Sequence, residues 1–508
     1  MGQSLMAHRK AICWLVVAAS AMASSMALLG TANTPSDPPP MAPGHGRSEP
    51  IQSLWRLSGS MSCASQGCHG RFESLVDQVF LRSEATIWLE RDPHSQAYEV
   101  LKSDRSRQIA ENLNGPGRPA HLDSRCLACH ANPLVAKYAE AKQDEIWKNP
   151  SLAKELDLAS SRGTGVGCES CHTLSGHTTS EYLQKHTVLG PTGIGFDAWQ
   201  SPESLRLKQL SGLANLSPAK NTAALCVSCH IGNPGSATEP IRDCNHDIMA
   251  AGHPRLVFDA ASYINQLPAH WNTTREKDPD GRNAALHVAG LIVSAAMQVR
   301  MASEHARKTG GAWPEFADQD CFSCHAGLGA STDSWRQRSW LANQSVGRIK
   351  PGAFVPCNAT LSIVASLSEK EGMKSAVEAW GKAVSKADKA NVAILGDAIL
   401  DELQKLEVEM LGIERLSADK RHAWLARVAG PSAVALDEGR WDQAQSHLRT
   451  LYWLSRGTSD APNTESFAKA FSDLTYPKGF DGPAGFRGPD RAGLFDSLAK
   501  WARKLAVN

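Results

Sequence analysis

The chain has 508 residues, with 53 Lys and Arg against 52 Asp and Glu, and 42% of its residues are hydrophobic. This length allows about three domains and a packed core. A formal net charge of +1 offers no basic surface for nucleic acid, so we expect no nucleic-acid partner. The unusual feature of the composition is the presence of 13 Cys together with 18 His.

The N-terminal segment indicates export. A short basic stretch, His8–Lys10, is followed by an apolar run that extends through Leu29. This order is typical of a secretory signal peptide, which we place at residues 1–32. An uncleaved membrane anchor is the alternative interpretation, and the chain would then attach to a membrane through this segment. Residues 33–54 are rich in Pro and Gly and predict an exposed linker, so we expect the remainder of the chain to be periplasmic.

Four segments of the chain repeat the pattern C-x-x-C-H. They end at His130, His172, His230 and His325, and their cysteines are Cys126 and Cys129, Cys168 and Cys171, Cys226 and Cys229, and Cys321 and Cys324. Two thiols two residues apart add to the two vinyl groups of one porphyrin, and the adjacent His reaches the iron. The pattern therefore predicts covalently attached haem c. Paired C-x-x-C zinc knuckles are the alternative, but they do not require a His after every second Cys.

A fifth haem site is predicted at Cys63, Cys68 and His69, where four residues instead of two separate the thiols. The longer loop can still present both sulfurs to the porphyrin, and a local disulfide between Cys63 and Cys68 is the alternative. Five haems would use ten of the 13 Cys. Of the other three, Cys13 lies in the N-terminal apolar segment, and Cys244 and Cys357 are candidates for a disulfide, which requires their Cα atoms to come close. We number the haem sites 1 to 5 in chain order.

The five sites follow one another closely between Cys63 and His325. Such spacing predicts haems that lie close to one another and form much of the core. We place this pentahaem cytochrome domain at residues 55–340. No convincing run of alternating strands occurs in the chain, so the predicted fold class is mainly α, with little regular secondary structure in the haem domain.

Several segments around the haem sites together resemble one protein family. They are residues 87–98, which contain Trp88 and then His94, residues 165–172 (GVGCESCH), residues 244–256 (CNHDIMAAGHPRL) and residues 313–337. These segments resemble the cytochrome c-554 family of multihaem c-type cytochromes. The third segment resembles the NHD-x-x-AAGHPRL motif of larger members of that family. The resemblance implies a multihaem electron carrier. It departs from the family at site 1, where the Cys spacing is longer, and at Ala326, where a second His often follows the last motif.

Each proximal histidine leaves the opposite side of its iron for a distal ligand. The resemblance implies that His94 is the distal ligand of site 3 and that His177 folds back onto site 1, with His186 as its rival. His246 and His253 are seven residues apart, roughly 10 Å along a helix, so each would face a different iron. The candidate distal ligands are therefore His94, His121, His177, His246 and His253.

Apolar residues at helical spacing predict the remaining elements. One helix is expected over 283–307, where His287 and His305 share a face that we assign to solvent or a haem edge rather than to iron. Residues 356–508 contain no haem motif and predict a helical C-terminal domain. Its expected helices lie within residues 369–380, 393–410, 439–454 and 494–505. Because every proposed ligand precedes this domain, we expect its deletion to leave the haem content nearly intact.

Two functions compete at this point. An exported multihaem c-type cytochrome would transfer single electrons between redox protein partners through closely packed haems. A multihaem oxidoreductase would act on a small nitrogen or sulfur oxide at a haem with an open axial position. The supply of candidate distal histidines favours closed irons, so we expect an electron carrier and assign no catalytic residue. A haem-based binding or scaffolding subunit is the third interpretation.

Overall fold

All described residues lie in one compact unit, residues 50–508. The other unit, Met1–Glu49, lies outside the described residues, and so do the predicted signal peptide or anchor and the linker. The computed structural model describes residues 59–76, 81–162, 165–173, 202–210, 212–310, 313–319, 359–368, 370–438, 441–457, 462, 464–473 and 494–507.

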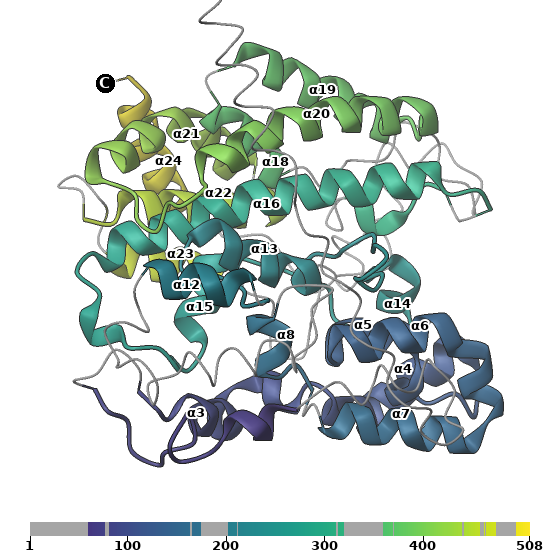
Figure 1. Cartoon of the computed structure of the whole chain (residues 1–508). Helices are drawn as coiled ribbons and strands as arrows, with labels where there is room; N and C mark the ends of the chain where they lie inside the picture. Colours follow the sequence, from purple (N-terminus) through teal and green to yellow (C-terminus); the bar gives the residue numbers. More distant parts are fainter. Residues whose placement is uncertain are drawn as a thin grey trace, which may run out of the picture. The chain divides into compact units, whose positions relative to one another are not determined.

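The described part of the chain consists of helices and connecting segments, without a strand (Figure 1). This confirms the predicted mainly α fold class. The helices are α3 (Glu84–Arg91), α4 (Asp104–Asn114), α5 (Ser124–His130), α6 (Pro133–Lys148), α7 (Pro150–Arg162), α8 (Cys168–His172), α12 (Pro202–Leu210), α13 (Ala219–His230), α14 (His246–Ala250), α15 (Ala260–Gln266), α16 (Pro279–Arg307), α18 (Ala359–Leu367), α19 (Glu371–Ser385), α20 (Lys389–Glu409), α21 (Ala418–Glu438), α22 (Trp441–Ser455), α23 (Thr464–Asp473) and α24 (Leu494–Val507).

The longest described helix, α16, is a core helix. The side chain of Asp278 caps its first turn by accepting a hydrogen bond from the backbone N–H of Gly281 at 2.9 Å, and Pro279 follows the cap, where its missing N–H costs nothing. By length and composition α16 could cross a membrane, but 83% of its most apolar window is buried within the unit. A helix that is buried to this extent is typical of the interior of a folded domain.

The helix expected over 283–307 is confirmed within α16, but the expectation for its histidine face is wrong. His287 is only 1% exposed and His305 only 8% exposed. The reason is that neighbouring helices cover α16 on several sides: α13 and α15 from the haem region, and α18, α20 and α22 from the C-terminal part. No periodicity within one helix could show that all its sides are covered.

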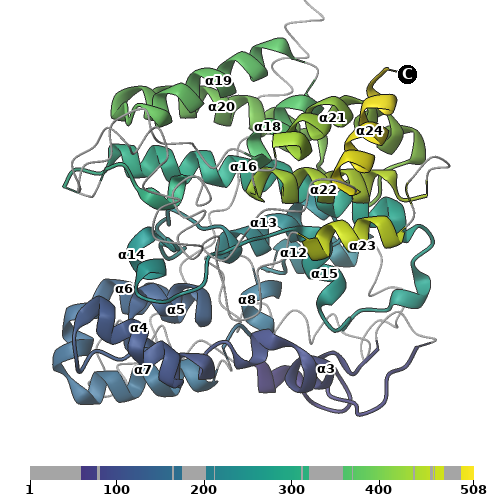
Figure 2. The ribbon, with the colours of Figure 1, turned by 180° about the vertical axis from the view of Figure 1, so that it is seen from behind.

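One hydrophobic core joins the haem region to the C-terminal helices. Buried side chains of α13, α15 and α16 belong to the same cluster as those of α18 to α24, and Figures 1 and 2 both show α20 and α22 beside α16. Backbone hydrogen bonds also connect the two parts, from Ala219 N to Ile413 O at 3.0 Å and from Leu416 N to Gly281 O at 2.9 Å. The expectation that the C-terminal part is dispensable does not fit this packing.

The helices expected in the C-terminal part are present as α19, α20, α22 and α24. The domain boundary expected between residues 340 and 356 lies outside the described residues and stays a prediction.

A second, smaller core holds α5, α6 and α7 together. Its fully buried side chains include Leu127, Val135 and Leu156, and Tyr98 joins them from the preceding segment. Leu127 lies inside the C-x-x-C-H pattern of site 2, between Cys126 and Cys129. This core therefore fixes the backbone on which site 2 is built.

Candidate haem sites

The motifs of sites 2, 3 and 4 each form the end of a helix. Helices α5, α8 and α13 terminate at His130, His172 and His230, so each motif is helical throughout. Residues i, i+3 and i+4 share one face of a helix, which means that the C-x-x-C-H spacing directs two thiols and one imidazole to the same side. Site 1 differs, because a short 3-10 helix, Ser60–Cys63, is followed by turns up to His69.

The thiols and proximal histidines of sites 1 to 4 line one cavity of about 1800 Å³. Three further histidines, His94, His253 and His270, line the same cavity. Pockets for single drug-sized ligands measure about 300–1,000 Å³, so this cavity has room for more than one large group. Cys321, Cys324 and His325 of site 5 lie outside the described residues, as does His177.

Inside the cavity, histidines from distant parts of the chain face one another in pairs. The ring centroids are 6.1 Å apart for His94 and His230, 6.4 Å apart for His130 and His253, and 6.4 Å apart for His172 and His270. Two imidazoles that bind one metal from opposite sides, each through a bond of about 2 Å, hold their centroids about 6 Å apart. The three pairs therefore fit one haem iron each.

The protonation of these rings also suits metal binding. His130 Nδ1 donates a hydrogen bond to the carbonyl of Ala97 at 2.8 Å, and His253 Nδ1 donates to the carbonyl of Pro254 at 2.8 Å. Because a carbonyl can only accept, Nε2 of both rings keeps its lone pair for iron. Burial lowers the pKa of His130 and His253 and lowers the pKa of His230 to about 4, so these imidazoles are neutral at neutral pH.

The pairing differs from the sequence expectation at site 3. The resemblance implied that His94 serves site 3, whereas the structure places His94 opposite His230 of site 4. The ring opposite His172 belongs instead to His270, which was missed because no haem motif surrounds it and because the pairing joins residues far apart in the chain. No local signal in the sequence identifies His270.

The position of His94 follows from the chain around it. Helix α3 ends at Arg91, and the side chain of Asp92 accepts a hydrogen bond from the backbone N–H of His94 at 2.9 Å. Gly165 has a positive φ of 73°. It lies so close to the backbone of His94 that a Cβ atom at this position would be 3.0 Å from the His94 carbonyl oxygen. Glycine is needed at this position for both reasons. The segment before site 3 therefore supports the turn that carries His94.

Sites 1 and 3 are in direct contact. The backbone N–H of Gly59 donates to the Glu169 carboxylate at 3.1 Å, and the backbone N–H of Cys168 donates to Ser60 Oγ at 3.2 Å. Gly59 and Ser60 lead into Cys63 of site 1, while Cys168 and Glu169 belong to site 3. These bonds connect the attachment segments of two haems.

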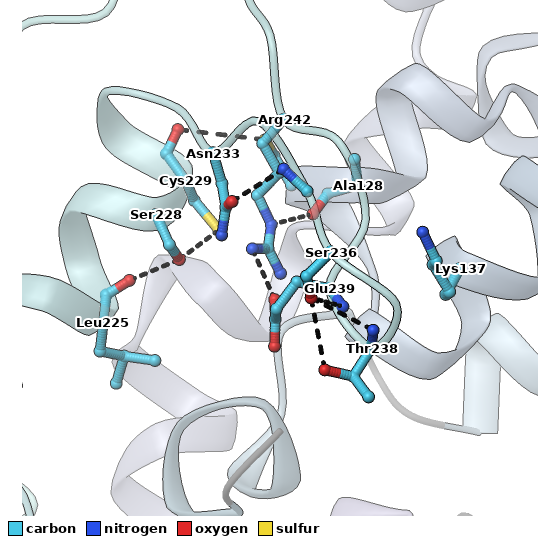
Figure 3. Close-up of polar contacts among 12 residues, drawn as sticks. Ala128, Lys137, Leu225, Ser228, Cys229, Asn233, Ser236, Thr238, Glu239 and Arg242 are labelled. Carbon is cyan, nitrogen blue, oxygen red and sulfur yellow. Dashed lines mark hydrogen bonds and ion pairs between the residues drawn. The ribbon is translucent and has the colours of Figure 1, made fainter. Parts of the chain in front are cut away.

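The buried side chain of Arg242 connects sites 2 and 4 (Figure 3). This side chain belongs to a residue that is only 3% exposed. Its Nε donates to the carbonyl of Ala128, inside the motif of site 2, at 2.7 Å, and its Nη1 pairs with Glu239 at 2.8 Å. Its backbone forms two hydrogen bonds of 2.8 Å with Asn233, shortly after the motif of site 4. Arg242 therefore holds the two attachment segments together.

Comparison with known proteins agrees with this geometry. Residues 63–173, which contain sites 1, 2 and 3, match the family model described as cytochrome c554 and c-prime. This segment is similar to the cytochrome c554 family. The protein is therefore a multihaem c-type cytochrome that binds haem c covalently and takes part in electron transfer. No curated protein and no solved structure matches the chain significantly.

Two predicted ligands of this cytochrome lie away from the main cavity. His121 is not among the lining residues, although its backbone carbonyl accepts a hydrogen bond from buried Tyr98 at 3.5 Å. The backbone N–H of His246 donates to Glu315 at 2.9 Å, and its ring lies edge-on to Phe316 with centroids 5.4 Å apart. His246 thus lies beside the segment that leads into site 5.

None of the cysteines among the described residues forms a disulfide. Cys63 and Cys68 are both unpaired, so the local disulfide between them is not formed, and Cys244 is free as well. Cys357 lies outside the described residues, and its pairing stays a prediction. Within the described ranges no three His, Cys, Asp or Glu side chains converge as a metal-ion site. Opposed pairs of imidazoles are the arrangement that haem iron needs, whereas structural zinc takes four ligands.

Proposed function

We propose that this protein is an exported pentahaem cytochrome that passes single electrons between redox protein partners through closely packed haems. The export is proposed from the N-terminal segment, since haem c is attached outside the cytoplasm and the apolar run of residues 1–32 has the features of a signal peptide or anchor. The periplasm is then the compartment in which the protein acts.

The observation that carries the proposal is the set of three opposed histidine pairs. At sites 2, 3 and 4 the two rings of each pair would hold an iron from opposite sides, which would leave a small molecule no free coordination position there. Closed irons suit electron transfer and disfavour the alternative, an oxidoreductase acting on a small nitrogen or sulfur oxide. When bound, haem supplies one-electron exchange between ferric and ferrous iron.

The residues of the chain have three tasks in this function. The thiols hold each porphyrin covalently, the paired imidazoles hold its iron, and the apolar walls of the shared cavity exclude water. The direct contacts between sites 1 and 3, and the bridge that Arg242 forms between sites 2 and 4, keep the attachment segments together in pairs. A rigid protein environment of this kind keeps the haem irons at fixed distances from one another during electron transfer.

Distal ligands are also proposed for the two remaining sites, 5 and 1. His246 lies against Glu315 and Phe316, shortly before Cys321, and is proposed as the distal ligand of site 5. His177 is proposed for site 1 on the family resemblance. The number of five haems includes site 1 with its longer Cys spacing and site 5.

Intact-mass measurement of the exported protein tests the haem number. Five covalent haems raise the mass of the polypeptide by roughly 3 kDa. A gain equivalent to four haems, with Cys63 and Cys68 unmodified in a peptide map, would remove site 1 from the proposal. Expression without residues 1–32 should give a chain without covalent haem.

The ligand assignment is tested by comparing His270→Ala with His121→Ala. The first variant removes the ring opposite His172, so one haem should change from six-coordinate low-spin to high-spin and bind carbon monoxide when reduced. The second removes a ring that does not line the cavity, so the spectrum should be unchanged. An unchanged spectrum of His270→Ala, or a new high-spin haem in His121→Ala, would contradict the assignment.

A further inference from the structure

The axial histidines differ in what their Nδ1 atom meets. At site 2 both rings, His130 and His253, donate to neutral backbone carbonyls. At site 4 His94 Nδ1 meets the carboxylate of Asp92 at 2.9 Å, and at site 1 His69 Nδ1 meets the carboxylate of Glu84 at 3.0 Å. The chain therefore supplies charged partners at two sites and neutral ones at a third.

Asp92 is held firmly in its position. Its side chain is 3% exposed, and one oxygen, Oδ1, accepts from both the backbone N–H and the ring Nδ1 of His94. Asp92 thus meets only the Nδ1 side of the ring and leaves Nε2 to the iron.

Glu84 repeats this arrangement at site 1. It lies in the first turn of α3 with a side chain that is 16% exposed, and His69 of site 1 is its partner. Glu84 and Asp92 lie at the two ends of the same short helix, α3.

A carboxylate that accepts the Nδ1 proton makes an imidazole a stronger electron donor to its metal. A stronger donor stabilises ferric iron over ferrous iron and lowers the reduction potential, and a hydrogen bond to a neutral carbonyl does this less.

We propose that Asp92 and Glu84 are positioning residues that lower the potentials of sites 4 and 1 below that of site 2. Among sites 1, 2 and 4, electrons then settle at site 2. Each transfer moves one electron between two irons and no atoms, and the Nδ1 proton stays in the imidazole–carboxylate bond. This inference rests on the ligand pairs of the proposed function.

The test is a spectroelectrochemical titration of the fully loaded protein carrying Asp92→Asn. Asparagine is as good an N-cap as aspartate and retains an acceptor oxygen, so this change removes the charge and keeps the local fold. We expect one midpoint potential to rise by about 59 mV, a tenfold change in the ferric to ferrous ratio. Glu84→Gln should raise a different midpoint by a similar amount. Midpoints that stay fixed or fall in both variants would overturn the proposal.

Asp388→Asn is the matched control. Asp388 also caps a helix, α20, through a hydrogen bond from the backbone N–H of Asn391, but it does not line the haem cavity. Its replacement should leave every midpoint unchanged. A shift as large as that of Asp92→Asn would mean that distant charge, rather than the bond to His94, sets the potential.

A further variant, His94→Ala, separates failure of this inference from failure of the ligand assignment. If His94→Ala leaves all haems low-spin, then His94 is not a ligand and the proposed pairing fails. If His94→Ala produces one high-spin haem, the midpoint it displaces identifies site 4, and Asp92→Asn must raise that same midpoint. A high-spin haem in His94→Ala together with an unmoved midpoint in Asp92→Asn would overturn the inference alone.

Discussion

His287 uses both of its ring nitrogens inside the protein. Nδ1 meets Asp259 at 2.5 Å and Nε2 meets Thr450 Oγ1 at 3.0 Å, and the indole N–H of Trp453 donates to the same aspartate at 3.1 Å. No nitrogen of this ring is left for a metal. Because Thr450 and Trp453 belong to α22, the network connects the haem region to the C-terminal helices. The aspartate of this network, Asp259, directly follows Phe258 in the chain, and the Phe258 ring stacks on His230 of site 4 with centroids 5.5 Å apart.

His305 is the second buried histidine of α16 and lies between two carboxylates. Nδ1 is 2.9 Å from Asp318 and Nε2 is 3.0 Å from Asp243, which Lys308 approaches at 3.9 Å. Burial lowers the pKa of His305, but the two hydrogen bonds and the charges of both aspartates outweigh it and raise the pKa to about 10. The ring is therefore an imidazolium that holds the segment before site 5 against α16.

This environment predicts a loss of stability in alkaline solution. Since the pKa of His305 is about 10 in the folded protein against an ordinary value of 6.5, the folded state binds more protons between these values. The contribution is complete below pH 6.5 and disappears as the pH rises toward 10. The thermal midpoint, followed by circular dichroism, should fall across this window. His305→Gln should lower the midpoint by the equivalent of about 3–5 kcal/mol at pH 6.5 and remove most of this pH dependence. Equal pH profiles in both proteins would contradict the assignment.

At the scale of elements, the contact between α16 and α20 is close because Gly396 of α20 has no side chain. A Cβ atom at this position would lie 2.1 Å from Ser303 Oγ and 3.5 Å from Trp380 Nε1. Ser303 is fully buried on α16. The two helices can therefore approach only while both residues stay small.

Gly396→Ala should lower stability by about 1–3 kcal/mol through this overlap, measured as a shift in the thermal midpoint. The double variant Gly396→Ala with Ser303→Ala removes the Oγ atom that the new methyl group meets, so it should recover most of the loss. Additive losses in the double variant would show that the contact is not the cause.

Sequence patterns predicted the motifs and helices that depend on residues close together along the chain. The C-x-x-C-H motifs, the helix over 283–307 and the helices near 393–410 and 494–505 all follow from short-range spacing. The partner of each proximal histidine does not, because His270 meets His172 only through tertiary folding. For the same reason the burial of His305 was unpredictable, since its two aspartates come from other segments.

At the scale of the molecule, the cytochrome region and the C-terminal helices depend on each other. Arg415, in the segment between α20 and α21, lines the haem cavity and pairs with Glu276 from the haem region at 2.8 Å. Together with the shared core around α16, this contact gives the C-terminal helices a part in closing the cavity.

Truncation at residue 357 should therefore reduce the yield of fully loaded protein and expose α16. We expect a lower thermal midpoint and, by intact mass, fewer haems per chain, because α16 loses apolar neighbours along most of its length. Retention of every haem together with an unchanged thermal midpoint would instead show that residues 55–340 form an independent domain.

In the proposed function, histidine pairs from distant segments close the irons of this multihaem cytochrome. Carbon monoxide titration of the fully reduced wild-type protein tests it most directly, because the gas binds only where an axial position is open. We expect the three haems of the opposed pairs to stay low-spin and free of carbon monoxide. Rapid binding that leaves fewer than three haems unliganded by the gas would contradict it.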